Sequence, residues 1–153
     1  SNDQIFVSSW DGFLYSVQIS TGVVSWKIPF EKSNQSSVAI LKEKNFGYIS
    51  SKKGLCRFHL ENKSPLLCTE VPNGSGARKS SPIITKSMPG QVRGGYIVWV
   101  PCKNENICAY DINLKLLKEW KTGADSSGEI RPYRNGVMSM TQGESGLFIL
   151  SPE

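Results

Sequence analysis

Residues 7–27 read VSSWDGFLYSVQISTGVVSWK and contain three strand-like runs separated by two turn signals. Asp11-Gly12 is a strong hairpin signal, because these two residue types accept the backbone angles of tight turns. Thr21-Gly22 marks a second turn, after which a β-branched and aromatic run resumes through Trp26. The segment therefore predicts three short strands joined by tight turns.

The rest of the chain contains imperfect copies of this unit. The run at 13–17 is followed by similar runs at 54–58, 106–110 and 146–150. They recur roughly 40–50 residues apart, which is the range of one propeller blade with a loop insertion. An apolar run precedes each copy, and a short polar link joins the two as a hairpin requires. The sequence therefore predicts an all-β fold, a β-propeller or partial propeller of consecutive four-stranded antiparallel blades.

Four units with the bounds 3–30, 36–70, 80–122 and 126–153 divide the chain, which we expect to be one domain. The sequence starts at the second strand of one unit and stops after the third strand of another. It therefore predicts part of a larger propeller, with a compact four-bladed ring and a half-ring that pairs with its own copy as alternatives. A β-sandwich is the competing fold.

The first unit resembles the repeat of the PQQ-like (quinoprotein-dehydrogenase-like) β-propellers. The residues that carry the resemblance are Asp11-Gly12-Phe13-Leu14-Tyr15, Thr21-Gly22 and Trp26-Lys27, with Ser80-Ser81-Pro82 and Trp120-Lys121-Thr122-Gly123 in a later unit. The second unit lacks the Asp-Gly, the Thr-Gly and the Trp. WD40 is the runner-up repeat class, although the Trp-Asp pair here precedes the hairpin turn instead of ending a strand.

The resemblance implies a quinone in catalytic members, held between a tryptophan and a disulfide of adjacent cysteines, beside a calcium ion. This sequence has no adjacent Cys-Cys pair, and Asp11, Asp111 and Asp125 are dispersed among turns and strand ends. We therefore expect no cofactor and no enzymatic activity, which places the chain in the non-catalytic branch. A fragment of a quinone-dependent dehydrogenase is the alternative.

The cysteines and the histidine predict packing positions. The four cysteines, Cys56, Cys68, Cys102 and Cys108, lack the CxxC spacing of a zinc site, so no metal is expected. A turn at Asn104-Glu105 would direct Cys102 and Cys108 to opposite faces of their hairpin, so all four are expected as free thiols. His59 lies on a predicted strand and is read as structural.

The net charge of +5 is spread over scattered basic residues without a block of like charges, so nucleic-acid binding is not expected. No apolar run is long enough to predict membrane insertion by this segment. Asn34, Asn62 and Asn73 begin glycosylation sequons, which permit a secretory route. An extracytoplasmic compartment is favoured over the cytoplasm.

Trp10 at the hairpin tip is the aromatic residue expected to be exposed, and exposed aromatics beside loops are good interface anchors. The candidate partner-binding residues are Trp10, Asp11, Lys52, Lys53, Arg78 and Lys79. The predicted function is a scaffold or sensor module that binds a protein partner, or its own copy, through blade loops or an edge strand. Glycan binding is a further alternative.

Overall fold

The structure is a computed structural model that describes residues 3–32, 34–52, 54–70, 81–87, 95–102, 106–121, 130–134, 136–140 and 147–150. In these ranges the chain forms fourteen β-strands and one 3₁₀ turn, η1 (Lys42–Lys44). The strands are β1 (Gln4–Ser8), β2 (Phe13–Gln18), β3 (Val24–Pro29), β4 (Ala39–Leu41), β5 (Phe46–Ser50), β6 (Gly54–His59), β7 (Leu67–Glu70), β8 (Ile83–Lys86), β9 (Tyr96–Cys102), β10 (Asn106–Tyr110), β11 (Leu116–Lys121), β12 (Ile130–Tyr133), β13 (Gly136–Met140) and β14 (Leu147–Leu150).

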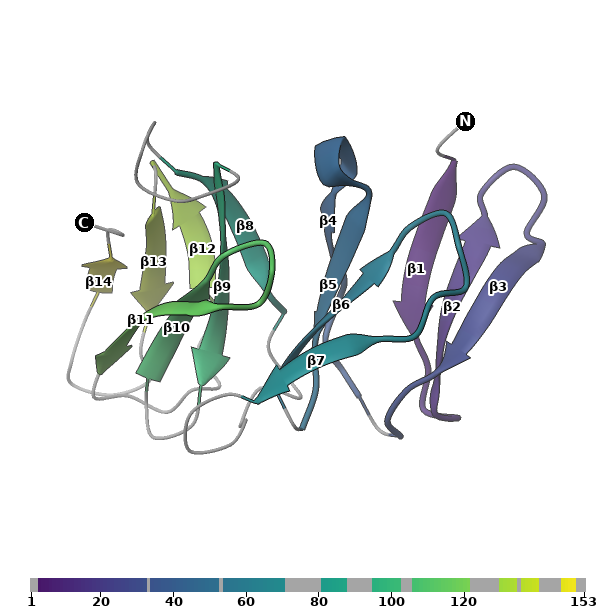
Figure 1. Cartoon of the computed structure of the whole chain (residues 1–153), viewed down its shortest axis with the longest axis horizontal. Coiled ribbons are helices and arrows are strands. Elements are labelled where there is room, and N and C mark those ends of the chain that lie inside the picture. Colours follow the sequence, from purple (N-terminus) through teal and green to yellow (C-terminus); the bar gives the residue numbers. More distant parts are fainter. Residues whose placement is uncertain are drawn as a thin grey trace.

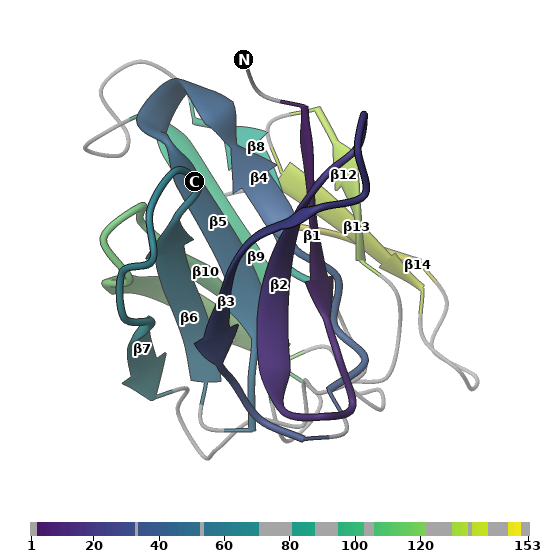
Figure 2. The same cartoon turned by 90° about the vertical axis from the view of Figure 1, so that its right-hand side faces the viewer.

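The strands form four antiparallel sheets, each built from strands that follow one another in the sequence. Their orders are β1-β2-β3, β4-β5-β6-β7, β8-β9-β10-β11 and β12-β13-β14, called here sheets 1 to 4. Figure 1 shows the sheets side by side across the molecule, and Figure 2 shows sheet 1 in front with the others behind it. The predicted all-β fold is confirmed, and consecutive antiparallel sheets that pack face to face are the arrangement of propeller blades.

Each pair of neighbouring sheets encloses its own hydrophobic core. Leu14 and Trp26 of sheet 1 pack against Ile49 and Phe58 of sheet 2. Sheets 2 and 3 share a second core, and sheets 3 and 4 share a third. The inner strands β5 and β9 of sheets 2 and 3 are buried on both faces, as their uninterrupted buried runs show. The alternating apolar pattern of β1 therefore marks a sheet with one covered face.

The first strands of sheets 2, 3 and 4 lie next to one another. β4 contacts β8, and β8 contacts β12. Each is the first strand of its sheet and pairs with the strand that follows it in the sequence. Sheet 1 has no such strand among the described residues, since β1 pairs with β2 alone.

The internal repeat is visible in the strand pairing. A bulge interrupts the β2–β3 ladder between Ser16 and Val17, and another interrupts the β10–β11 ladder between Ala109 and Tyr110. These are matching positions of the two copies. Trp26 and Trp120 differ, however, because Trp26 lies opposite Ser16, whereas Trp120 lies opposite Ile107, two residues before Ala109, which is the residue that matches Ser16.

The expectation of four free thiols was wrong. Cys56 is directly opposite Cys68 in the β6–β7 ladder, and these two residues form a disulfide. Cys102 lies opposite Asn106, one residue away from the predicted register, so it shares a face with Cys108. Because the observed register differs by one residue from the expected one, Cys102 and Cys108 also form a disulfide, with their Cα atoms 6.0 Å apart.

Candidate functional site

The hairpin between β1 and β2 holds Trp10 in the solvent. The N–H of Gly12 donates to the carbonyl of Ser9 at 3.2 Å, and Gly12 has a φ of 94°, a conformation that glycine adopts without steric penalty. The N–H of Ser9 donates to the carbonyl of Phe13 at 2.9 Å and closes a three-residue loop. The side chain of Trp10 on this loop is 67% exposed, as the sequence predicted.

Asp11 fixes the same turn with its carboxylate. Oδ1 accepts the N–H of Phe13 at 3.1 Å, and Oδ2 accepts the hydroxyl of Tyr15 at 2.5 Å. The hydrogen bond from Tyr15 lowers the pKa of Asp11, because it stabilises the ionised carboxylate, and the same bond raises the pKa of the Tyr15 hydroxyl. Trp10 is therefore presented by a turn with internal support.

The segment that follows β3 brings a second turn next to this hairpin. The N–H of Phe30 donates to the carbonyl of Gly12 at 2.7 Å. One residue further, both carboxylate oxygens of Glu31 accept the backbone N–H of Lys52 at 2.9 Å. Lys52 lies in the turn between β5 and β6, so the β1–β2 and β5–β6 turns lie at one edge of the molecule, the lower edge in Figure 1.

We call this surface the turn face, formed by Trp10, Asp11, Glu31, Lys32 and Lys52. The two acidic and two basic side chains offset each other, and the indole of Trp10 is its large apolar group. The structure thus brings together Trp10, Asp11 and Lys52 of the candidate residues. Lys53, Arg78 and Lys79 lie outside the described residues.

A buried asparagine beneath the surface of the turn face holds its segments together by hydrogen bonds. Asn34 is 2% exposed, and its Nδ2 donates to the carbonyl of Ser50 at 2.7 Å and to Oε1 of Glu31 at 2.8 Å. Its Oδ1 accepts the N–H of Ser36 at 2.8 Å. Sequence reasoning registered Asn34 only as a sequon, yet a glycan on this side chain is incompatible with its burial.

Sequence reasoning missed Glu31 and Asn34 as parts of the candidate site. Their contacts depend on the β5–β6 turn, about 16–21 residues further along the chain. The available signal was the polar run at 31–37 directly after an apolar strand, which is typical of a linker with side-chain hydrogen bonds.

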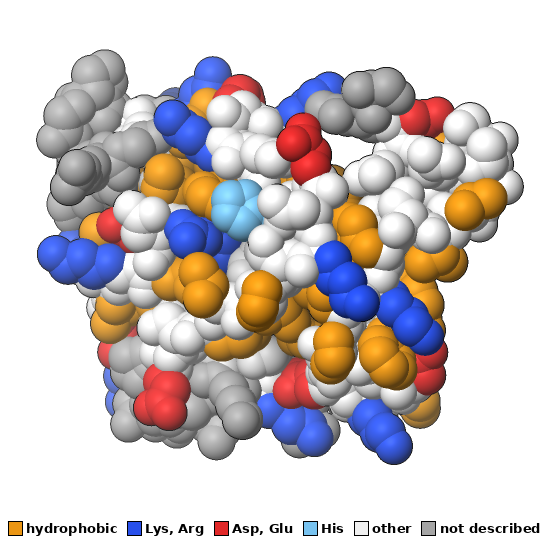
Figure 3. All heavy atoms as spheres, turned by 45° about the vertical axis from the view of Figure 1, so that its right-hand side comes forward, with side chains coloured by type: hydrophobic (Ala, Val, Ile, Leu, Met, Phe, Trp, Pro, Cys, Tyr) orange, Lys and Arg blue, Asp and Glu red, His pale blue; other side chains and the backbone are white. Residues whose placement is uncertain are grey.

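Sheet 1 also exposes an apolar face, the open face. The β1–β2–β3 register places Ile5, Val7 and Val24 on the side of sheet 1 away from sheet 2, where they are 46%, 45% and 47% exposed. Phe13 lies on this side with the Nζ of Lys27 4.6 Å from its ring centre. Figure 3, turned toward this side of the molecule, shows hydrophobic side chains in orange beside basic ones in blue.

The histidine and the possible metal ligands considered in the sequence analysis do not form a further site among the described residues. The ring of His59 lies 4.9 Å from the ring of Phe46, centre to centre, and packs against it. In the part of the chain that the structure describes, no group of three or more His, Cys, Asp or Glu side chains is placed to hold a metal ion. That same part contains no helix long and apolar enough to span a bilayer.

Comparisons with known proteins support the fold. No protein-family model and no curated protein matches the sequence. Three solved structures resemble the chain. The computationally designed Ika8 protein has a TM-score of 0.65 and 17% sequence identity, and the match covers 97% of this chain and 43% of Ika8. BamB from Moraxella catarrhalis has a TM-score of 0.66 and 13% identity over 96% of this chain and 45% of BamB, and BBS1N in complex with ARL6DN has a TM-score of 0.65 and 16% identity over 95% of this chain and 45% of BBS1N.

BamB and BBS1N are propeller proteins, so the chain has a β-propeller fold. At these sequence identities the likeness shows the fold alone. The chain spans less than half the length of each of the three structures.

Proposed function

We propose that this propeller segment is a non-enzymatic interaction module that binds a protein partner through the turn face. The observation that carries the proposal is Trp10, 67% exposed on a turn that Asp11 and Gly12 hold in one conformation. Tryptophan is enriched among the residues that dominate binding energies, and a pre-ordered anchor loses little conformational entropy on binding. Glu31, Lys32 and Lys52 of the turn face supply charges that suit the polar rim of an interface.

Two further observations support a binding role. BBS1N is a structural neighbour found in complex with ARL6DN, which is an example of this fold with a protein partner. The four cysteines form the bridges Cys56–Cys68 and Cys102–Cys108, which differ from the adjacent-cysteine disulfide of quinone-dependent propellers. The bridges are therefore compatible with the proposed non-catalytic branch of the PQQ-like repeat class.

The two disulfides also support an extracytoplasmic location. Disulfides persist in oxidising compartments and are rare where glutathione and thioredoxin keep thiols reduced. We therefore propose that the module acts in an extracytoplasmic compartment, the periplasm or the secretory pathway.

The test compares partner capture by the wild-type protein with capture by Trp10→Ala and Val23→Ala. Val23 is 59% exposed and lies in the turn between β2 and β3, so it is a matched control away from Trp10. Captured proteins are then purified and their affinities measured by calorimetry. We expect Trp10→Ala to weaken binding by more than tenfold and Val23→Ala by less than twofold. A partner that binds all three proteins equally would contradict the proposal.

Self-association is a second form of partner binding, favoured by the open face. Contiguous exposed apolar side chains such as Ile5, Val7 and Val24 mark interaction surfaces. Light scattering over a concentration series should show a mass that rises reversibly above 16.9 kDa. Val7→Lys should hold the protein monomeric, and a wild-type protein that is monomeric at every concentration would refute this second form.

A further inference from the structure

β7 is attached to the molecule differently from the outer strands of the neighbouring sheets. Among the described residues, β3, β7 and β11 end sheets 1, 2 and 3, and each pairs only with the strand before it. Trp26 and Ile28 of β3 are buried in the core between sheets 1 and 2. Trp120 of β11 packs against Trp99, with the ring centres 5.3 Å apart. None of the four residues of β7 is buried.

A disulfide connects β7 to the core in place of such a side chain. Cys56 of β6 is 0% exposed and belongs to the core between sheets 1 and 2. Cys68 lies directly opposite on β7, is exposed, and is bonded to Cys56. Figure 2 shows β7 at the outer edge of sheet 2. The bridge therefore extends from the core to the edge of the sheet, and Cys68 is its end nearest to the solvent.

The exposure of Cys68 is a property of sheet 2 itself. This sheet packs against sheet 1 on one face and against sheet 3 on the other, so β7 is exposed because it lies at the edge of the sheet. The other bridge, Cys102–Cys108, joins the neighbouring strands β9 and β10, and both of its cysteines are 0% exposed. The two bridges of the chain therefore differ in their access to solvent.

Access decides which disulfide reacts with a thiol, because the attacking thiolate must reach one sulfur atom and displace the other. An external thiolate that reaches Cys68 forms a new S–S bond to its Sγ. The bond between Cys68 and Cys56 breaks, and its electron pair leaves with the Sγ of Cys56, which takes a proton from water. The products are a mixed disulfide at Cys68 and a free thiol at Cys56, so one disulfide replaces another without net oxidation or reduction.

We propose that the Cys56–Cys68 bridge is a site of thiol–disulfide exchange in the folded protein, at which a low-molecular-weight thiol of the glutathione class bonds to Cys68 and releases β7. Once the bridge is open, β7 is held by a ladder of four residue pairs with β6 and by Leu66, which packs against the core just before the strand. Segments with few buried contacts and exposed backbone hydrogen bonds open at low free energy. This site goes beyond the proposed turn face and uses none of its residues.

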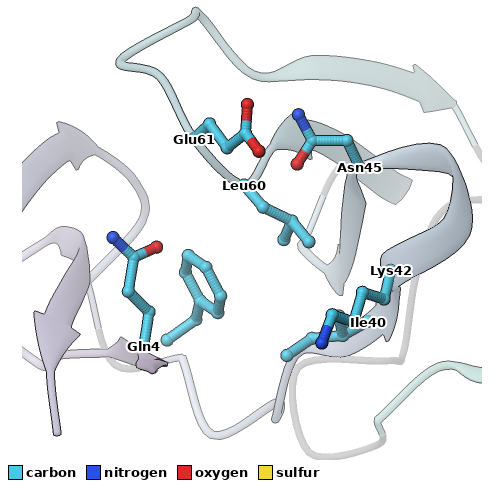
Figure 4. Close-up of a pocket in the computed structure, with 7 residues that line it drawn as sticks. Gln4, Ile40, Lys42, Asn45, Leu60 and Glu61 are labelled. Atoms are coloured by element: carbon cyan, nitrogen blue, oxygen red, sulfur yellow. The ribbon is translucent and has the colours of Figure 1, made fainter. Parts of the chain in front are cut away.

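The released segment is limited by Leu60, the first residue after β6. Its N–H donates to the carbonyl of Asn45 at 3.1 Å, and its carbonyl accepts the indole N–H of Trp26 at 3.3 Å. Leu60 and Glu61 line a cavity of about 160 Å³ between sheets 1 and 2, and Figure 4 shows them at the start of the loop that leads to β7. Neither hydrogen bond involves the disulfide, so opening of the bridge affects the chain after Leu60.

The experiment exposes the folded protein to reduced glutathione and maps the products by mass spectrometry. Free thiols are blocked with N-ethylmaleimide before trypsin digestion, which stops further exchange. Arg57 and Lys63 lie between Cys56 and Cys68, and Lys103 lies between the other two cysteines, so the digest places every cysteine on its own peptide. We expect the glutathione adduct on Cys68 to exceed that on Cys56 roughly tenfold, because access selects the attacked sulfur.

The Cys102–Cys108 bridge serves as the internal control. It should open about a hundredfold more slowly than Cys56–Cys68, because its sulfur atoms become accessible only when the protein unfolds. Low concentrations of urea increase the unfolded population. They should therefore accelerate the opening of Cys102–Cys108 and leave the rate at Cys56–Cys68 unchanged.

Amide hydrogen exchange tests the release of β7. We expect the amides of residues 67–70 to exchange roughly tenfold faster in the glutathione adduct than in the untreated protein, and those of β11 to stay unchanged. The double variant Cys56→Ala/Cys68→Ala should form no adduct at these positions and should show the same fast exchange in β7.

Equal opening rates of the two bridges would overturn the exchange site, as would an adduct mainly on Cys56. A rate at Cys56–Cys68 that rises with urea as steeply as that at Cys102–Cys108 would also overturn it, because the reaction would then require unfolding. Unchanged exchange in β7 after the bridge opens would overturn its release. Trp10→Ala should leave all these results unaltered, so they are independent of the turn face.

Discussion

Asn34 is the single residue on which the turn face depends most. Asn34→Ala would leave the carbonyl of Ser50 and the N–H of Ser36 buried without their hydrogen-bond partner. Buried unsatisfied groups each destabilise the folded state, so we expect a loss of about 2–4 kcal/mol in the free energy of unfolding. Urea denaturation measures it, with the exposed neighbour Gln35→Ala as the control. Equal stabilities of the two variants would contradict the assigned role.

The Asp11–Tyr15 hydrogen bond gives the turn a defined pH dependence. Because the bond lowers the pKa of Asp11 below its ordinary 3.8, its contribution is present above that value and is lost as the pH falls through the lowered pKa. Tyr15→Phe removes the donor, so the pKa of Asp11 should rise toward 3.8. Carboxyl ¹³C NMR titration between about pH 2 and 6 reads this shift directly. Tyr133→Phe, on β12, should leave it unchanged.

Gly47 is required by the core between sheets 1 and 2. A Cβ at this position would lie 2.3 Å from Cζ of Phe58, whose ring packs between Phe6 and Trp26. We expect Gly47→Ala to lower the free energy of unfolding by about 1–3 kcal/mol, as overpacking does. The double variant with Phe58→Leu should lose less than the sum of the two single changes, since the smaller side chain vacates the space. Additive losses in urea denaturation would show that the close approach is not the cause.

At the scale of elements, the disulfides fix the hairpins that contain them. Cys56–Cys68 spans 12 residues and Cys102–Cys108 spans 6. Loop-closure entropy predicts that removal of the first by a double alanine substitution destabilises the protein by about 3 kcal/mol, and removal of the second by about 2 kcal/mol. Chemical denaturation of the two double variants tests this order. The unfolded wild-type protein should also show no thiol that reacts with iodoacetamide before reduction.

The disulfides depend on strand registers, which the sequence did not predict, although it did predict where the first strands lie. Turn signals and alternation located the runs that became β1, β2 and β3, because hairpins depend on neighbouring residues. The pairing of Cys102 depended on a one-residue difference in the β9–β10 register, which the sequence does not specify. The pairing of Cys56 with Cys68 depended on the β6–β7 register across residues 60–66, where Asp-Gly and Thr-Gly signals are lacking.

The features of the candidate site that depend on adjacent residues were likewise predictable, and those that depend on tertiary contacts were not. Trp10 and Asp11 belong to a local hairpin, so their exposure and turn geometry follow from adjacent residues. The charges of Glu31 and the amide of Asn34 act through the β5–β6 turn. The cavity lined by Phe6, Ile40 and Leu60 forms only when sheets 1 and 2 are packed together. Sequence patterns therefore predicted the exposure of Trp10 and the turn that holds it, and tertiary packing supplied their surroundings.

At the scale of the whole molecule, sheets 2 and 3 have neighbours on both faces, whereas sheet 1 exposes Ile5 and Val7 on one face. In a row of units that contact only their neighbours, stability depends on the interfaces that each unit makes. We therefore expect an exchange gradient in which β5 and β9 open only with global unfolding and β1 opens at a lower free energy.

Hydrogen exchange at low urea concentrations measures these opening energies strand by strand. Equal opening energies in all four sheets of the free protein would contradict this account. They would mean that the four sheets unfold as one cooperative unit.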